Sequence, residues 1–469
     1  MSKKVEIKKL IMHIGNYLSA SIFTKFLAFI SIPIFTRILG PNGYGGISIF
    51  TSVVAIIGIL ATFGVDTGIR RYCFEQKKDE KTFISSNLLF LFIWQSIILF
   101  SVFFFRKWLS IMLSLPIIII YLATATGILD SYKNIYMAYY QTKQKSKIIR
   151  NLSILSGSMV LVLSIILVVI TKDYTGKVYG TFISTCIIIF LLKNNIKKLN
   201  FRKLDTKLIL YSLSIGGPII FNQLAGYVLT FFDRLVINQY YGLSKTGQYS
   251  FAYNVAMLME VVIHAINVAW VPMMFEKLKD QKNEEINSYL ENLLKLVSFV
   301  AIGIILFSEE IIYILADSRF YEAVSLVPII IIGYVFRFFY TVYSNIEYYY
   351  KKTKMLAIFT IISGVLNVIL NIIFIPRYGY EMAAYTTLAS YVILFLLHYF
   401  YVHIYISKKI IKFSLFIKNF VFILFGILIY SWINLLNENY IFYFCLKIVL
   451  IVLFFITIFM KQMKQIFKK

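Results

Sequence analysis

Cysteine is scarce in this sequence, with Cys73, Cys186 and Cys445 as the only three among 469 residues. They are far apart and form no CxxC pair, so they fit neither a disulfide framework nor a metal site. A GxxxxGK[ST] loop is also missing, which argues against direct use of ATP. The sequence shows no nucleophile–base or metal-ligand constellation, and we expect neither an enzyme nor a metal site.

Acidic residues are few as well. The chain has 22 Asp and Glu against 47 Lys and Arg, a formal net charge of +25. Such an excess is compatible with nucleic-acid binding, but most of the basic residues lie in short loops between apolar runs. Positive loops beside membrane spans record orientation in the membrane. We therefore expect no nucleic-acid partner.

No hydrophilic stretch is long enough to form a soluble domain. Of all residues, 59% are apolar and 17% are aromatic. Apolar runs of about 20 residues, enough to cross ~30 Å of hydrocarbon, recur from end to end. The basic N-terminus is followed by no small-residue cleavage site, so the first run is expected to be a retained span. The sequence predicts an all-α polytopic membrane protein.

About fourteen apolar segments can be delimited. In the first half they are expected at 12–36, 44–68, 83–105, 109–138, 151–171 and 177–193. In the second half they are expected at 208–238, 247–274, 289–308, 321–349, 355–375 and 381–403, with a last hairpin at 413–433 and 440–460. Three parts follow: an N-terminal six-helix lobe (1–200), a C-terminal six-helix lobe (201–405), and a terminal hairpin with a basic tail (406–469).

The basic residues predict the orientation. An even number of spans places both termini on the same side, and Lys and Arg gather in alternate loops. The positive-inside rule makes these loops cytoplasmic, and both termini with them. The clusters are Lys3–Lys9, Arg70–Lys81, Lys143–Arg150, Lys193–Lys207, Lys277–Lys282, Lys351–Lys354, Lys408–Lys412 and Lys461–Lys469.

One stretch, Pro33–Phe50 (PIFTRILGPNGYGGISIF), joins the first two segments through a turn rich in Gly and Pro. Gly permits positive φ and Pro fixes φ near −65°, as a tight reversal needs. A related pattern, YGLSKTGQY, returns between the seventh and eighth segments, where Gly242 and Gly247 have the spacing of Gly40 and Gly45. The sequence therefore predicts two parallel, pseudo-symmetric repeats of six spans. In transporters, such repeats enclose the substrate path.

FTRILGPNGYG, at the end of the first segment, resembles the signature of bacterial polysaccharide repeat-unit flippases. These are the O-antigen, or Wzx-type, exporters of the multidrug/oligosaccharidyl-lipid/polysaccharide (MOP) superfamily. The resemblance implies a multi-pass protein of the bacterial cytoplasmic membrane that flips undecaprenyl-diphosphate-linked oligosaccharide by alternating access. It further implies that membrane lipid, a polysaccharide polymerase and glycosyltransferases are partners, and that the terminal hairpin cradles the polyprenyl tail.

Two other functions remain compatible with the sequence. A multidrug or metabolite cation antiporter of the same superfamily has the same architecture, but it more often exposes acidic residues to its substrates. A membrane glycosyltransferase or polymerase usually carries a sizeable external loop with catalytic residues, and this chain lacks such a loop.

Charges inside apolar segments mark the candidate site, because each costs roughly 2.5–3.5 kcal/mol at a helix centre. Lys25, Glu260 and Arg337 are expected near the midplane. In one hypothesis they line a hydrated cationic cavity, where Lys25 and Arg337 attract a diphosphate. In the other, a basic residue and Glu260 form a structural pair. Asn222 and Asn254 are expected to line the same cavity.

Glu260 and His264 lie one helical turn apart and are the candidates for ion coupling. A carboxylate and an imidazole together suit a proton relay or a cation site, which predicts coupling to a gradient of H⁺ or Na⁺. The alternative for His264 is a hydrogen bond to a carbonyl. No other cofactor is expected.

Three charged pairs lie near the ends of segments: Asp66–Arg70, Asp130–Lys133 and Asp233–Arg234. The first two are expected to form interfacial salt bridges or an inner gate. The third is expected to form an outer gate or to anchor its helix at the headgroups.

Gly216-Gly217-Pro218 interrupts the seventh segment. Because Pro removes a helix hydrogen bond and invites a bend, this tripeptide is a candidate hinge.

Overall fold

The computed structural model describes residues 3–75, 79–196, 205–408, 410–435 and 440–466. Parts of four predicted basic clusters lie outside the described residues, namely 76–78, 197–204, 409 and 467–469. The chain divides into two compact units, Met1–Ser250 and Phe251–Lys469. The first unit thus contains the beginning of the second predicted repeat.

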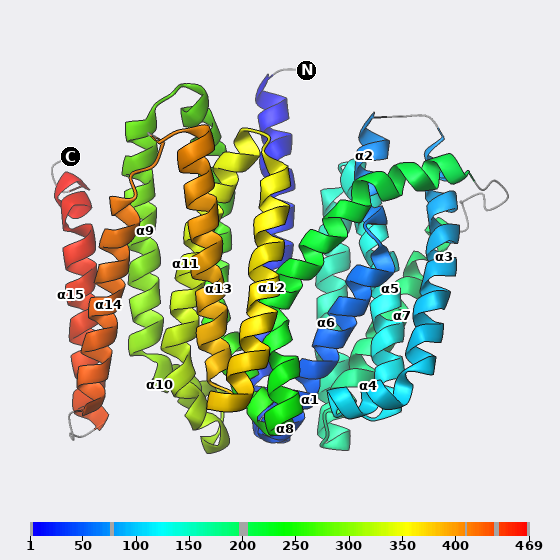
Figure 1. Ribbon diagram of the computed structural model, residues 1–469, viewed down its shortest axis with the longest axis horizontal. Helices are drawn as coiled ribbons and strands as arrows, with labels where there is room; N and C mark the ends of the chain where they lie inside the picture. The colour runs from blue at the N-terminus through cyan, green and yellow to red at the C-terminus, as the bar shows by residue number, and fades with distance from the viewer. Residues whose placement is uncertain (1–2, 76–78, 197–204, 409, 436–439, 467–469) are drawn as a thin grey trace. The chain divides into compact units, whose positions relative to one another are not determined.

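The regular elements in the described part of unit 1 are all helices (Figure 1). Its elements are α1 (Lys3–Thr62), α2 (Val65–Glu75), α3 (Glu80–Phe104), α4 (Arg106–Leu113), α5 (Ile117–Thr142), α6 (Ser146–Thr171), α7 (Thr175–Ile196) and the first part of α8 (Thr206–Lys279).

Unit 2 continues from the second part of α8 and is also helical where it is described. It contains α9 (Asn283–Leu306), α10 (Ser308–Leu315), the 3₁₀ helix η1 (Ser318–Leu326), α11 (Val327–Tyr349), α12 (Thr353–Tyr378), α13 (Met382–Tyr401), the π-helix η2 (Val402–Ile406), α14 (Ser414–Leu435) and α15 (Tyr440–Ile466).

The apolar helices agree with the predicted segments. Ten of the described helices are long and apolar enough to cross a membrane, and α4 and α5, which are bent by 98° relative to each other, pass the same test only as a pair. The predicted single segment 109–138 is therefore wrong as one continuous helix, because the chain breaks between Leu113 and Ile117. Two of the ten, α1 and α8, each break at one glycine and hold two predicted segments, while α15 contributes a shorter apolar helix, Ile441–Thr457. The predicted all-α polytopic membrane fold is confirmed.

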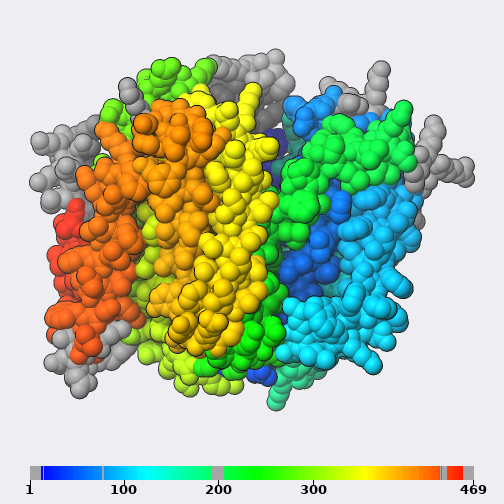
Figure 2. Space-filling model, viewed as in Figure 1, coloured from blue at the N-terminus to red at the C-terminus, as the bar shows by residue number. Residues whose placement is uncertain are grey.

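The distribution of side chains on α12 is that of a membrane helix. Its exposed residues include Ile362, Val365 and Ile369, which recur every three to four positions. Figure 2 shows α12 in yellow. Asn367 and Asn371 are buried. A surface helix of a soluble protein has the opposite arrangement, with apolar residues inside and polar residues outside.

The breaks in α1 and α8 fall at equivalent glycines. Gly40 has φ 62° and ψ −175°, and Gly242 has φ 76° and ψ −179°. Residues with a Cβ rarely adopt such positive φ. The prediction of a glycine-dependent turn is therefore right for these two positions. Gly43 and Gly45, which the sequence assigned to the same turn, are helical, and at Gly45 another constraint requires glycine.

That constraint is close packing between the two breaks. A Cβ added to Gly45 would lie 1.9 Å from the carbonyl oxygen of Leu243, and a Cβ added to Gly247 would lie 1.9 Å from that of Pro41. Only residues without a side chain let two backbones approach so closely. We call this contact of Gly45 with Gly247 the glycine crossing.

The glycine crossing has pseudo-two-fold symmetry. The hydroxyls of Ser48 and Ser250 lie 2.6 Å apart, and these residues are 202 positions apart in sequence. Gly45 and Gly247 have the same separation. Equivalent residues that contact each other lie on a two-fold axis, as in a symmetric dimer interface. The repeat inferred from glycine spacing is therefore also a spatial repeat at this point.

Candidate functional site

The predicted midplane charges of unit 2 pair with each other. Arg337 of α11 places Nη1 2.9 Å from Oε2 of Glu260 of α8, and its Nη2 donates to Oε1 at 3.2 Å. The guanidinium also lies 5.7 Å from the ring centre of Tyr334. The two charged side chains remain 28% and 24% exposed. Arg337 is thus held by Glu260 through one hydrogen bond and a second close contact between charges, and its side chain is partly exposed.

A second polar contact joins the same two helices. Asn345 donates from Nδ2 to Oδ1 of Asn267 at 3.2 Å, two turns along α8 from Glu260. His264, between Glu260 and Asn267, is exposed and makes no hydrogen bond or ion pair with any described residue. In this conformation Glu260 has Arg337 as its partner and His264 has none, and the coupling role of the two residues stays a prediction.

The three remaining predicted cavity residues are partly buried. Lys25, in the first part of α1, has no ion-pair partner in the described part of the chain. Asn222, in α8, keeps its buried Oδ1 without a hydrogen-bond donor among the described residues. Asn254, also in α8, does have a polar partner. Contact of these side chains with a substrate stays a prediction.

Asp233 and Arg234 are buried beside the glycine crossing, with 1% and 4% of their surface exposed. The hydroxyl of Tyr249 donates to Oδ2 of Asp233 at 2.5 Å. Nε of Arg234 donates to the hydroxyl of Ser250 at 3.2 Å, and that hydroxyl in turn contacts Ser48. These charges brace the break of α8 against α1. Their proposed role in an outer gate stays a prediction.

The other two predicted charged pairs are formed. Nη1 of Arg70 lies 2.8 Å from Oδ2 of Asp66, and its Nε donates to Gln141 of α5 at 3.1 Å. Nζ of Lys133 lies 2.5 Å from Oδ1 of Asp130. Whether these ion pairs open and close during transport stays a prediction.

The predicted hinge, Gly216-Gly217-Pro218, includes one residue with a packing role. A Cβ on Gly216 would lie 2.3 Å from the carbonyl oxygen of Gly64, which has φ +68° at the break between α1 and α2. Gly217 has nothing within 4 Å of an added Cβ. Within the described α8, non-helical φ and ψ occur at Gly242. Gly216 is thus required for a close helix contact, and hinge motion stays a prediction.

The close contact between Gly216 and Gly64 is extended by α2. A Cβ on Gly68 would lie 2.1 Å from Oγ of Ser212, and the hydroxyl of Tyr211 donates to Glu75 at 2.8 Å. Arg71 donates to the same carboxyl at 2.7 Å and lowers the pKa of Glu75. The carboxylate therefore stays ionised and accepts both hydrogen bonds at neutral pH.

Sequence reasoning missed a buried ion cluster between α15 and α10. Lys447 is 1% exposed, and its Nζ lies 2.8 Å from Glu310 and 3.2 Å from Glu309. A single lysine in the otherwise uncharged segment 440–460 was the available signal, because a charge there needs a partner.

It also missed two groups of buried polar residues, one between α11 and α13 and one between α12 and α13. Nδ1 of His398 lies 2.6 Å from Oε1 of Glu347, and both side chains are buried. Asn371 donates to Asn367 at 2.9 Å, and Asn367 donates to Thr387 at 3.3 Å. The signal for the asparagines was their spacing of four residues in an apolar run.

The family and a relative can be identified from the sequence. The profile of the polysaccharide biosynthesis protein family matches residues 12–278, and the MatE profile matches residues 218–373. The probable low-salt glycan biosynthesis flippase Agl15 of Haloferax volcanii is 24% identical over 459 residues, covering 89% of this chain and 94% of that protein.

Solved structures share the fold. The lipid II flippase MurJ in its inward closed conformation matches with a TM-score of 0.72 and 18% identity, covering 95% of this chain and 98% of the other. An inward-facing multidrug resistance MATE family transporter of the MOP superfamily matches with a TM-score of 0.62 and 16% identity, covering 90% and 100%. With the MOP fold in place and the first profile covering more than half of its length, the chain belongs to the polysaccharide biosynthesis protein family.

Proposed function

We propose that this protein is a flippase that moves undecaprenyl-diphosphate-linked oligosaccharide repeat units across the bacterial cytoplasmic membrane. The observation that carries the proposal is the similarity to a glycan biosynthesis flippase over 89% of this chain. Membership in the polysaccharide biosynthesis family and the fold shared with a lipid II flippase support it. The protein would act as a transporter and not as an enzyme, and would serve glycosyltransferases and a polymerase.

Alternating access of the two repeats would expose the hydrophilic part of the substrate to each side in turn. The sugar and diphosphate would cross among polar side chains while the polyprenyl tail stays in lipid. Arg337 suits the diphosphate, because a guanidinium offers a planar fork of donors and part of its surface is open. Lys25 would supply a second cation. Glu260 and His264 would couple transport to a gradient of H⁺ or Na⁺.

A multidrug antiporter is the second candidate, because the MatE profile matches residues 218–373 and a MATE transporter shares the fold. A cationic drug would need a carboxylate free to receive it. Glu260, the midplane carboxylate of unit 2, is paired with Arg337 instead, which favours an anionic substrate.

A reconstituted flipping assay tests the proposal. Vesicles containing the full chain and a fluorescently labelled undecaprenyl-diphosphate-linked oligosaccharide should expose the label to an external quencher much faster than vesicles without protein. A flipping rate equal to that of protein-free vesicles, together with accumulation of a cationic dye driven by an ion gradient, would assign the protein to the antiporters.

We further propose that both termini face the cytoplasm and that the turn after Gly40 faces outwards. The variant Asn42→Cys, in a background without Cys73, Cys186 and Cys445, should react with a membrane-impermeant maleimide added to intact cells. Labelling only after the cytoplasmic side is opened would reverse the assigned orientation.

A further inference from the structure

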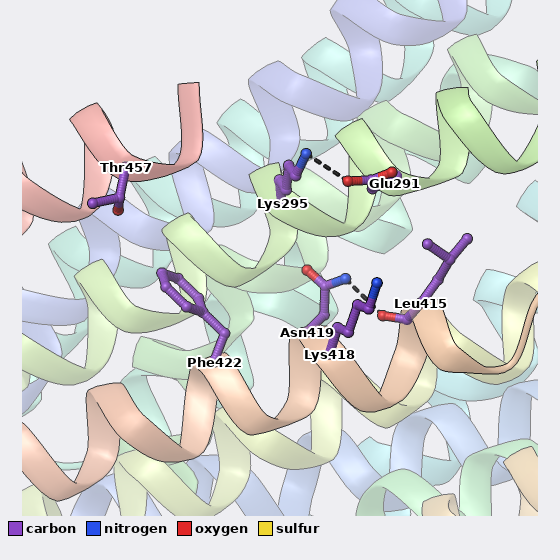
Figure 3. A pocket seen from close by; sticks show the side chains of 7 residues that line it. All are labelled: Glu291, Lys295, Leu415, Lys418, Asn419, Phe422 and Thr457. Atoms are coloured by element: carbon purple, nitrogen blue, oxygen red, sulfur yellow. Dashed lines mark hydrogen bonds and ion pairs between the residues drawn. The ribbon is translucent and has the colours of Figure 1, made fainter. Parts of the chain in front are cut away.

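A pocket of about 220 Å³ lies within unit 2 between α9, α14 and α15 (Figure 3). Glu291 and Lys295 line it from α9, and Lys418 and Asn419 line it from α14. The pocket lies near Ser414, the first residue of α14. The basic segment Lys408–Lys412 precedes this helix in the sequence. Charged side chains of α9 therefore gather beside the first turns of α14.

The charges in this pocket do not cancel. Nζ of Lys295 lies 2.7 Å from Oε1 of Glu291, so these two groups neutralise each other. Lys418, on the facing helix in Figure 3, makes no hydrogen bond or ion pair with any residue that the structure describes. Among the side chains that the structure describes, the pocket thus has one positive charge without a counter-charge.

Lys418 is one turn inside an apolar span, Ser414–Ile433. Its neighbours Ile417 and Val421 are 50% and 57% exposed, so this part of α14 faces lipid. A lysine in such a position extends its ammonium group towards the headgroup layer, where phosphate oxygens accept its hydrogen bonds. An anion from that layer would supply the missing counter-charge.

The pocket is held open by the protein itself. Asn419 donates from Nδ2 to the carbonyl of Leu415 at 2.7 Å, and its Oδ1 accepts a hydrogen bond from Ser298 of α9 at 3.1 Å. The first bond holds the Asn419 side chain against its own helix, and the second ties α14 to α9. Because Asn419 is already engaged, the ammonium groups are the donors left for a ligand.

We propose that this pocket binds the phosphate of an anionic glycerophospholipid, with Lys295 and Lys418 as its cationic contacts. The acyl chains would lie along the exposed apolar side of α14, where Val421 and Phe425 are 57% and 54% exposed. That adjacent apolar surface favours a lipid over a soluble anion. Basic pockets between membrane helices recognise anionic headgroups in this way. The bound lipid bridges α9 and α14 and holds the terminal hairpin.

Thermal unfolding of the detergent-solubilised full chain tests this proposal. Dioleoylphosphatidylglycerol should raise the unfolding midpoint in a saturable manner, and dioleoylphosphatidylcholine should not. Lys418→Gln and Lys295→Gln should each weaken the apparent affinity for the anionic lipid about fivefold. Glu291→Gln should strengthen it, because this change removes the carboxylate that repels phosphate and occupies Lys295.

Lys412→Gln is the matched control. Lys412 also lies at the start of α14, but it pairs with Glu284 at 2.9 Å and does not line the pocket. Its variant should keep the affinity of the unmodified protein. Equal stabilisation by both lipids, or equal affinities of Lys418→Gln and Lys412→Gln, would overturn the proposal. Inorganic phosphate that abolishes the lipid effect by competition would assign the pocket to a soluble anion instead. These outcomes concern lipid binding alone and do not depend on transport.

Discussion

Gly45→Ala is expected to lower the free energy of unfolding of unit 1 by about 3 kcal/mol, the upper end of the usual cost of overpacking. The added Cβ would lie 1.9 Å from the carbonyl oxygen of Leu243, and a backbone oxygen cannot rotate away. Intrinsic propensity predicts the opposite sign, because Gly to Ala in a helix ordinarily stabilises by about 1 kcal/mol. The measurement is the thermal unfolding midpoint of the purified protein, with the amount of folded protein in the membrane as a second readout.

Gly226→Ala is the matched control for this prediction. Gly226 lies in α8, and an added Cβ there has nothing within 4 Å, so its variant should unfold at or above the unmodified midpoint. Gly247→Ala should be as damaging as Gly45→Ala. The loss of unfolding free energy in the double variant should be smaller than the sum of the losses in the two single variants, because both methyl groups disturb one contact. Equal midpoints for Gly45→Ala and Gly226→Ala would show that the glycine crossing has room for a methyl group.

Arg337→Ala should abolish flipping while the protein still accumulates in the membrane, and Arg337→Lys should keep part of the rate. Lysine preserves the charge that pairs with Glu260 but loses the planar fork of donors that would engage a diphosphate. The cost in stability should be about 1–3 kcal/mol, between the values for exposed and buried ion pairs, because the side chains are partly exposed. The measurements are the flipping rate in vesicles and the unfolding midpoint.

The exchanged double variant Glu260→Arg with Arg337→Glu separates a structural role from a binding role. It restores an ion pair between α8 and α11, so stability should recover. Flipping should not recover, because the cation is then on the wrong helix. Recovery of both stability and flipping would mean that the ion pair serves only to hold α8 and α11 together.

Glu260→Gln in the same vesicles examines coupling to a gradient. One charge moved through 100 mV is worth about 2.3 kcal/mol, enough to bias an alternating-access cycle. We expect flipping by the unmodified protein to respond to a gradient of H⁺ or Na⁺, and flipping by Glu260→Gln to lose that response. An unchanged response would leave consumption of the product by a downstream polymerase as the source of direction.

The features that could be predicted from the sequence are local ones. The apolar segments follow from length and composition alone, and the break at Gly40 follows from a cluster of Gly and Pro. The repeat was recognised because two glycines at each turn share one spacing. The close approach of Gly45 to Leu243 was not predictable, because spacing along the chain does not reveal which backbone lies opposite.

Which residues far apart in sequence pair with each other could not be predicted, for the same reason. Glu260 and Arg337 are 77 positions apart, and the sequence alone left open whether Arg337 meets this carboxylate, a substrate or both. Asp66 and Arg70 could be paired in advance because four residues make one helical turn. Glu347 and His398 could not, since their contact depends on how α11 and α13 pack.

The buried ion cluster of Lys447 has a consequence for biogenesis. During synthesis α15 emerges after α10, and a lysine at a helix centre costs about 2.5–3.5 kcal/mol to place in lipid. Glu310 precedes Lys447 by 137 residues, so its helix has left the ribosome before the lysine is translated. The helix that carries the acidic partners of Lys447 thus precedes α15 in synthesis. We therefore expect that pairing with Glu309 and Glu310 offsets the cost of placing this lysine in the membrane.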